Sequence, residues 1–262
     1  MEYKTIRFEV SGGVATITLN RPEAANGLNL DSGKDLMLAA IRCDEDPSIR
    51  AVVLTGAGKM FSAGGDLKFF ASYGEALPKV LKEMTVYCHA AASRFMRMKA
   101  PLVTAVNGPA AGMGMSFAIS GDFILAAESA SFTAAYTATG LSPDGAMSWL
   151  LPRMIGLNRA REMMLTNRKV AAAEALQWGL VNRVVPDAEL AAEAAKLAGL
   201  LAAGPTQSFG TVKKLLNETF SATLETQMEQ EARGITDMTK TADALEGVKS
   251  FLERRRPAFT GR

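Results

Sequence analysis

The chain has 262 residues, of which 48% are hydrophobic and 21% are charged, so we expect one or two globular domains with a substantial core rather than a disordered chain. The 29 Lys and Arg nearly balance the 27 Asp and Glu, which argues against nucleic acid or an anionic membrane as a partner. Only two cysteines occur, without a Cys-x-x-Cys motif, so we expect no disulfide framework and no metal site. These features, with no apolar run near the N-terminus, fit a cytoplasmic protein.

The first part of the chain predicts a β-hairpin, a helix and a buried strand. Residues Thr5–Val10 and Val14–Leu19 alternate apolar and polar side chains around a Ser-Gly-Gly turn, which is typical of a hairpin. Residues Leu28–Ile41 predict an amphipathic helix capped by Asp31. The apolar run Ala51–Leu54 predicts a buried parallel strand.

The middle of the chain continues this alternation. A long helix is predicted over Ala76–Lys99, followed by buried strands at Pro101–Val106 and Phe123–Ala127. The stretch Ala100–Gly121 carries no charge and is long enough to cross a bilayer, but Asn107-Gly108-Pro109 interrupts it. It therefore predicts a buried strand, a turn and a buried helix, within an α/β core that has right-handed crossovers.

From about Ala146 onward the pattern is almost wholly helical. The predicted helices are Leu157–Leu165, Ala171–Trp178, Asp187–Ala203, Pro205–Phe220 and Thr241–Arg254. The Ala-Gly-Pro at 203–205 marks the expected boundary between a core of residues 1–203 and a helical C-terminal region of residues 204–262.

Two glycine-rich segments are candidate binding loops. Thr55–Met60 lacks the first Gly and the Ser/Thr of a Walker A loop, and Gly112–Phe117 lacks the last Gly of a dinucleotide fingerprint, so neither supports an NTPase or a dehydrogenase. Each is expected to follow a strand and open a helix, which would aim free backbone N–H groups at a common edge. Two such groups can bind one developing oxyanion, although either loop alone is more simply a tight turn.

Three segments resemble, in order and spacing, the signature of the enoyl-CoA hydratase/isomerase (crotonase) superfamily: Asn20–Pro22, Phe61–Leu67 and Ala105–Gly112. Two later segments, Ala175–Val181 and Gly247–Glu253, resemble the same family, so the resemblance covers nearly the whole chain. It implies an α/β, crotonase-like spiral of ββα turns over residues 1–203. It also implies a C-terminal helical region that forms a homotrimer or a hexamer. The implied substrate is an acyl-CoA thioester, with coenzyme A as part of the substrate and no separate cofactor.

Carried over residue by residue, the resemblance makes the backbone N–H groups of Gly65 and Met113 the donors of an oxyanion hole. Met113 stands where members of the family often have Gly, so its side chain would narrow or line the acyl pocket. The resemblance also implies contacts with the CoA and acyl groups from two loops and the second glycine segment. These residues are Ala24, Ala25, Leu28, Ala63, Gly64, Asp66, Leu67, Pro109, Gly112 and Ser116.

The resemblance also bears on proton transfer. Hydratases of the family carry two glutamates, because adding water to a double bond requires activating the water and protonating carbon. The matching positions here are Ser116 and Tyr136, so efficient hydration by that arrangement is not expected. One carboxylate lies nearby in sequence, Asp144 in a Ser-Pro-Asp-Gly turn, where the residues alone favour a cap for a helix starting near Gly145.

An acid at the position of Asp144 is catalytic in two kinds of member that the chain resembles: enoyl-CoA isomerases of phenylacetate degradation and 4-chlorobenzoyl-CoA dehalogenase. His89 is expected on a helix surface, yet it stands where the dehalogenase has its general base. Tyr136 stands where that enzyme has an aromatic partner of its nucleophilic Asp.

We therefore predict a Δ3-Δ2 enoyl-CoA isomerase in which Asp144 moves a proton between two carbons. The N–H groups of Gly65 and Met113 would hold the enolate oxygen meanwhile, and Tyr136 would shape the pocket or orient Asp144. Three alternatives stay open at this stage. They are a hydratase with an atypical site, a dehalogenase with Asp144 as nucleophile and His89 as base, and a silent acyl-CoA-binding or RNA-binding relative.

Overall fold

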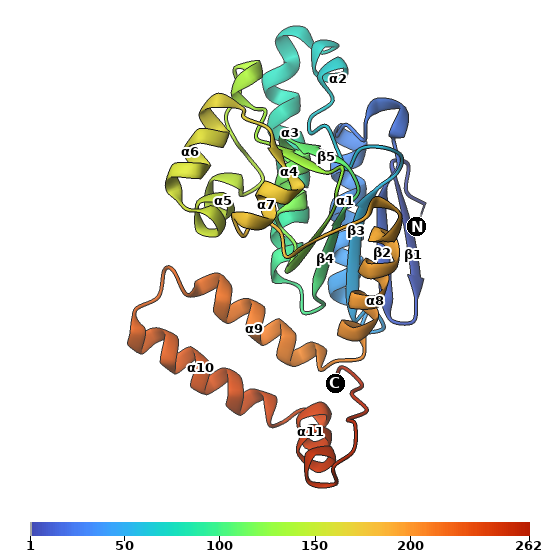
Figure 1. Ribbon diagram of the computed structural model, residues 1–262, viewed down its shortest axis with the longest axis vertical. Helices are drawn as coiled ribbons and strands as arrows, with labels where there is room; N and C mark the ends of the chain where they lie inside the picture. The colour runs from blue at the N-terminus through green and yellow to red at the C-terminus, as the bar shows by residue number, and fades with distance from the viewer. Residues whose placement is uncertain (1) are drawn as a thin grey trace.

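A computed structural model describes residues 2–262 and shows an α/β core from which three C-terminal helices extend (Figure 1). The main sheet has six strands in the order β1-β2-β3-β4-β6-β9, and a smaller sheet has the order β5-β7-β8. The strands of the main sheet are β1 (Ile6–Ser11), β2 (Val14–Leu19), β3 (Ala51–Gly56), β4 (Leu102–Val106), β6 (Phe123–Ala127) and β9 (Arg183–Val185). Those of the smaller sheet are β5 (Pro109–Ala111), β7 (Ser131–Thr133) and β8 (Val170–Ala171).

The predicted hairpin is confirmed. Strands β1 and β2 pair antiparallel with Ile6 opposite Leu19. Gly12 and Gly13, at φ 57° and 79°, form the two-residue turn that needs a left-handed conformation at both central positions. From β2 to β9 every neighbouring pair in the main sheet is parallel. Because β3 and β4 are covered on both faces, their side chains form almost continuous apolar runs, as the sequence predicted.

Helices cover both faces of the main sheet, with α8 (Leu190–Ala202) in front of it and α1 (Leu30–Glu45) behind it in Figure 1. Helix α1 packs against α3 (Leu77–Arg97). The predicted cap of α1 is wrong, because Asp31 lies inside the first turn. Asn29 caps the helix instead, and its side chain accepts the N–H of Ser32 at 2.9 Å.

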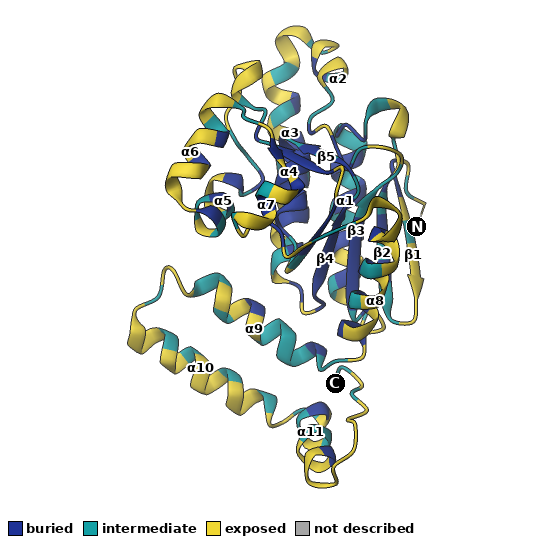
Figure 2. Cartoon of the chain, in the orientation of Figure 1, coloured by how far each residue is buried: buried dark blue, intermediate teal, exposed yellow. Residues whose placement is uncertain are grey.

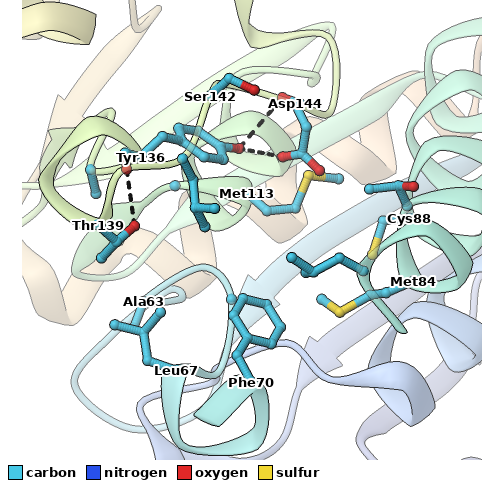
Figure 3. Close-up of a pocket in the computed structure, with 16 residues that line it drawn as sticks. Ala63, Leu67, Phe70, Met84, Cys88, Met113, Tyr136, Thr139, Ser142 and Asp144 are labelled. Carbon is cyan, nitrogen blue, oxygen red and sulfur yellow. Dashed lines mark hydrogen bonds between the residues drawn. The ribbon is translucent and has the colours of Figure 1, made fainter. Parts of the chain in front are cut away.

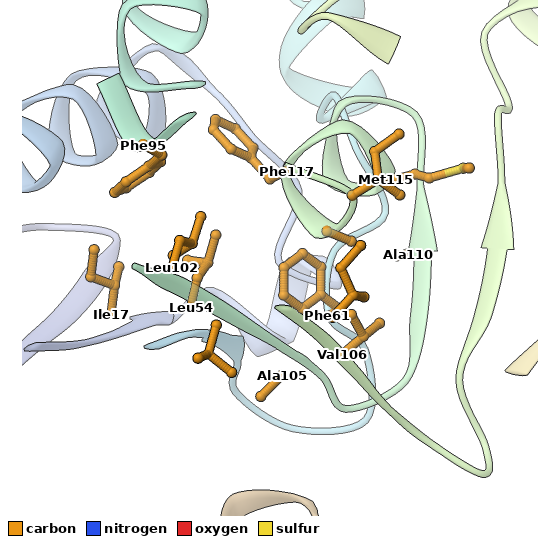
Figure 4. Packing of buried hydrophobic residues seen from close by; sticks show 14 of the residues in the cluster. Ile17, Leu54, Phe61, Phe95, Leu102, Ala105, Val106, Ala110, Met115 and Phe117 are labelled. Atoms are coloured by element: carbon orange, nitrogen blue, oxygen red, sulfur yellow. The ribbon is translucent and has the colours of Figure 1, made fainter. Parts of the chain in front are cut away.

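The uncharged stretch forms the predicted buried strand β4, a turn at Asn107-Gly108 and the buried helix α4 (Met113–Ala118), but the short strand β5, which was not predicted, lies between the turn and the helix. The turn at Gly108 passes so close to the preceding loop that a Cβ there would lie 2.1 Å from the carbonyl oxygen of Lys59. Figure 4 shows Phe117 of α4 beside Phe95 of α3, and their ring centroids are 6.5 Å apart. Within residues 2–262 there is no helix with the length and apolarity that a bilayer crossing requires.

The second half of the core contains elements that the sequence did not predict. Strands β8 and β9 interrupt the helical pattern, and each has only two or three residues, too few to show a periodicity. The remaining core helices are α2 (Leu67–Ala71), α5 (Met147–Ile155), α6 (Leu157–Thr166) and α7 (Ala172–Gln177).

The C-terminal region comprises α9 (Thr206–Glu218), α10 (Leu224–Met238) and α11 (Ala242–Leu252), of which α10 was not predicted. Lys213 of α9 is buried and lies 2.7 Å from the Asp122 carboxylate, so a charged pair ties α9 to the core. Much of the rest of the C-terminal region is exposed (Figure 2), and α10 has no buried residue. The division of the chain into residues 1–203 and 204–262 stays a prediction.

Candidate active site

A pocket of about 300 Å³ opens between α2, α3, the start of α4 and the segment that runs from Tyr136 to Asp144 (Figure 3). Its wall is mostly apolar. One side is built from α3, where Leu81, Met84 and Cys88 recur at helical spacing. Burial raises the pKa of the Cys88 thiol to about 12, so this sulfur stays protonated and contributes an apolar surface.

The first backbone donor belongs to Gly65. Its neighbours pair with Leu28: the Leu28 N–H donates to the Gly64 carbonyl at 2.7 Å, and the Asp66 N–H donates to the Leu28 carbonyl at 2.8 Å. In such a parallel bridge the central residue directs its own N–H away from the partner strand. The Gly65 N–H therefore points from the bridge towards the pocket that Gly65 lines, and it donates to no other residue of the described chain.

The second donor is the N–H of Met113, the first residue of α4, which has no partner within its own helix. Gly112 adopts φ 51° just before it and turns the chain from β5 into the helix. The two donor segments are joined directly, because the Ala111 N–H donates to the Ser62 carbonyl at 2.9 Å. The fold thus brings the predicted pair of donors, Gly65 and Met113, to one pocket wall.

The prediction for the first glycine segment is wrong. The first glycine segment, Thr55–Met60, does not open a helix, because a loop runs from the end of β3 to α2 at Leu67. Gly65 lies near the end of that loop, and its neighbour Gly64 has φ 89°. A Cβ at Gly64 would lie 2.7 Å from the Ala111 carbonyl oxygen, so the close approach of the two segments requires glycine.

Asp144 faces the pocket with its carboxylate held by Tyr136, whose hydroxyl donates to Oδ1 at 2.6 Å (Figure 3). Burial, followed by the negative charge of Asp144, raises the pKa of the Tyr136 phenol, so it remains a donor. The Ser116 hydroxyl donates to the Asp144 backbone carbonyl at 2.9 Å and lies 3.2 Å from the Tyr136 oxygen. Ser116 is buried behind this network and does not line the pocket.

The expected helix-capping role of Asp144 is wrong. Helix α5 starts at Met147, its N-cap residue is Ala146, and no side chain caps it. The Met147 N–H bonds at 3.2 Å to the backbone carbonyl of Asp144. The carboxylate is therefore free for the contacts described above.

The structure brings His89 to the same site. Its Nε2 lies 3.3 Å from Asp144 Oδ2, and it accepts a hydrogen bond from the Gly145 N–H at 3.2 Å. About half of the His89 side chain is exposed. A residue expected on a helix surface thus contacts the one carboxylate of the pocket.

The predicted substrate-binding residues divide into two groups. Ala63, Leu67 and Gly112 line the pocket, whereas Ala24, Ala25, Leu28, Gly64, Asp66 and Pro109 do not. The Asp66 carboxylate is occupied by structural contacts, since it accepts the Phe69 N–H at 3.1 Å and pairs with Arg21 at 2.9 Å.

Apart from Leu67, sequence reasoning missed the pocket residues of α2 and α3, among them Phe70 and Thr85. The helical spacing of Leu81, Met84 and Cys88 was the available signal for the α3 wall.

Comparisons with known proteins agree with this geometry. A family model described as Enoyl-CoA hydratase/isomerase matches residues 9–262. The chain is 41% identical over 262 residues, and over the full length of both chains, to a probable enoyl-CoA hydratase of Rhodobacter capsulatus. It is 38% identical to a 1,2-epoxyphenylacetyl-CoA isomerase of Escherichia coli, with 97% of each chain covered. It is 36% identical to a 4-chlorobenzoyl coenzyme A dehalogenase of an Arthrobacter species, covering 88% of this chain and 84% of that protein.

Among solved structures, a putative enoyl-CoA hydratase/isomerase from Mycobacterium abscessus superposes with a TM-score of 0.93 at 35% identity, covering 98% of this chain and all of the other. The fold is that of crotonase, and fold and site together define an enzyme that acts on acyl-CoA thioesters. The chain belongs to the enoyl-CoA hydratase/isomerase family.

Proposed function

We propose that this enzyme is a Δ3-Δ2 enoyl-CoA isomerase with Asp144 as its acid and base. The observation that carries the proposal is the single carboxylate in a pocket that also presents the free N–H groups of Gly65 and Met113. One carboxylate is sufficient to remove a proton from one carbon and return it to another. No cofactor is needed, since coenzyme A belongs to the substrate.

In this mechanism the thioester oxygen accepts hydrogen bonds from the Gly65 and Met113 N–H groups. Asp144 takes a proton from the α carbon of a 3-enoyl chain, and the C–H electrons move into a dienolate whose charge rests on the thioester oxygen. Donors fixed where this charge develops stabilise the transition state. The protonated Asp144 then delivers a proton to the γ carbon, which leaves the double bond between the α and β carbons.

The hydrogen bond from Tyr136 indicates which of the two carboxylate oxygens of Asp144 takes the proton. Its hydroxyl donates to Oδ1 of Asp144, which leaves Oδ2 to take the proton. Because burial and the Asp144 charge keep the phenol protonated, its donation stabilises the carboxylate between turnovers.

We expect hydration of crotonyl-CoA to be slow, because Ser116 and Tyr136 occupy the positions of the two hydratase glutamates and are engaged with Asp144. The test is product analysis with a panel of 3-enoyl-, 2-enoyl- and 4-chlorobenzoyl-CoA. Rapid isomerisation of the 3-enoyl ester alone supports the proposal. Hydration at a rate comparable with ordinary hydratases would show that another group activates water.

A second candidate is a dehalogenase-type displacement on an aryl-CoA ester, with Asp144 as nucleophile and His89 as base. The 3.3 Å separation of His89 Nε2 and Asp144 Oδ2 favours it, as does the similarity to a dehalogenase. Release of chloride from 4-chlorobenzoyl-CoA in the same panel would support this candidate over the isomerase.

We further propose that the enzyme is a trimer or a dimer of trimers. The supporting observation is the large apolar side chains exposed on and beside α10, namely Phe220, Leu224, Met228 and Ile235. Apolar patches of this kind are covered in most soluble proteins. Light scattering at micromolar concentration should give a mass that is a multiple of three chains, and a monomer would contradict the proposal.

A further inference from the structure

We propose that His89 is a positioning residue: its Nε2 accepts the Gly145 N–H and thereby fixes the turn that carries Asp144, while His89 itself moves no proton. The inference concerns the same site as the proposed isomerase, and only its kinetic test rests on that function. It also separates the two candidate functions, because a dehalogenase would need His89 as a base.

The direction of one hydrogen bond decides the protonation of the ring. The Gly145 amide is always a donor, and the peptide plane fixes where its hydrogen points, so the 3.2 Å contact requires a lone pair on Nε2. An imidazole nitrogen with an available lone pair carries no proton. The ring is therefore neutral, with its single proton on Nδ1.

The contact of His89 Nε2 with Asp144 competes with the bond from Gly145 and is long for an ion pair. A protonated imidazole paired with a carboxylate forms a charge-assisted bond of about 2.7–2.9 Å. The separation between Nε2 and Oδ2 is 3.3 Å, longer than such a bond. One nitrogen cannot both donate to Oδ2 and accept the Gly145 N–H, and the contact with the Gly145 N–H is the shorter of the two, at 3.2 Å.

This turn needs external support because of its conformation. Gly145 and Ala146 are consecutive left-handed residues, at φ 60° and 66°, and that region is unfavourable for alanine. The turn also packs tightly, since a Cβ at Gly145 would lie 2.3 Å from the Met113 sulfur. Ser116 fixes the carbonyl of Asp144, and His89 fixes the next N–H, so the peptide that follows Asp144 is held at both of its polar atoms.

The role of His89 follows from these contacts. Helix α3 holds the turn through Nε2, which keeps the Asp144 carboxylate at a fixed place relative to the donors of Gly65 and Met113. If His89 took a proton at Nε2, the ring would present a hydrogen to the Gly145 N–H and the bond would be lost. General-base action at this atom would thus disturb the turn that positions the carboxylate.

The first experiment uses the fact that His89 is the only histidine of the chain. With ¹⁵N-labelled histidine, the NMR spectrum of the free enzyme at neutral pH should show an unprotonated, pyridine-like Nε2 and a protonated, pyrrole-like Nδ1. A proton on Nε2, in the neutral or the charged ring, would overturn the proposal. This measurement requires no substrate and decides the tautomer even if the isomerase function proves wrong.

The second experiment compares His89→Gln with His89→Leu in steady-state isomerisation. The Gln side-chain oxygen can accept the Gly145 N–H, whereas Leu fills a similar volume without an acceptor. We expect Gln to keep kcat within about threefold, and Leu to lower kcat about ten- to a hundredfold with little change in KM, the scale of a misplaced catalytic group. Thermal melts serve as the folding control.

Two results would overturn the positioning role. Equal losses of about two to four orders of magnitude in both variants would assign proton transfer to His89. Full activity of His89→Leu would show that the turn holds without the bond.

Discussion

Asp144→Asn should lower the rate of proton transfer by about two to four orders of magnitude, the usual loss when a general base is removed. Binding of the CoA ester should hardly change, because the amide has the shape of the carboxylate. Its oxygen can still accept the Tyr136 hydroxyl, which donates to Oδ1 at 2.6 Å in the parent enzyme. The direct measurement is exchange of the α-hydrogens of the substrate in deuterated water, followed by mass spectrometry.

Stability provides the control for this variant. The Asp144 side chain caps no helix, so a lost cap, normally about 1 kcal/mol, is not expected in the melt. A suitable companion is Tyr136→Phe, which removes the donor to Oδ1 and leaves the carboxylate in place. Exchange at the parent rate in Asp144→Asn would exclude Asp144 as the base.

Gly65→Ala should lower kcat/KM about a hundredfold, through the position of the oxyanion donor. A Cβ at this residue would lie 2.5 Å from the Cε2 and Cζ atoms of the Phe70 ring, so the loop or the ring must shift. Gly65 is not among the residues of positive φ, which makes the steric contact with Phe70 the cause of the loss. Steady-state kinetics with a 3-enoyl-CoA ester measures the effect.

The matched control is the double variant Gly65→Ala with Phe70→Leu, compared with Phe70→Leu alone. If the ring is what displaces the donor, the smaller side chain should restore part of the lost kcat/KM. Unchanged turnover of the single variant would contradict this prediction, because it would mean that the Phe70 ring moves aside and the Gly65 donor stays in place.

The fold could be predicted where a local pattern carries the information. The hairpin follows from alternation and two glycines, and β3, β4 and β6 follow from their apolar runs, because burial on both faces leaves few polar positions. The boundaries and caps of the helices could be predicted less well from the sequence. Asn29 rather than Asp31 caps α1 because its extended backbone lets the side chain reach the Ser32 N–H, which composition alone does not show.

In the candidate site, too, the sequence predicted single residues but not the long-range contacts between them. The resemblance placed Gly65, Met113 and Asp144, and the structure brings all three to one pocket. The contact of His89 with Gly145 joins residues 56 positions apart, and no periodicity in the sequence encodes it. The hydrogen bond from Ser116 to the Asp144 carbonyl joins residues 28 positions apart, and it could not be predicted from the sequence either. Long-range polar contacts depend on how elements dock, whereas sequence patterns report on single elements.

The hydrogen bonds around Asp144 come from the same two side chains, Ser116 and Tyr136, that would have to be replaced to install a pair of glutamates. A glutamate in place of Tyr136 would remove the donor to Oδ1 and set a second negative charge against the first, since the two side chains are in direct contact. A glutamate in place of Ser116 would remove the bond that fixes the Asp144 carbonyl. We therefore expect that glutamates placed at residues 116 and 136 would also disturb the turn at residues 144–146 that carries the Asp144 carboxylate.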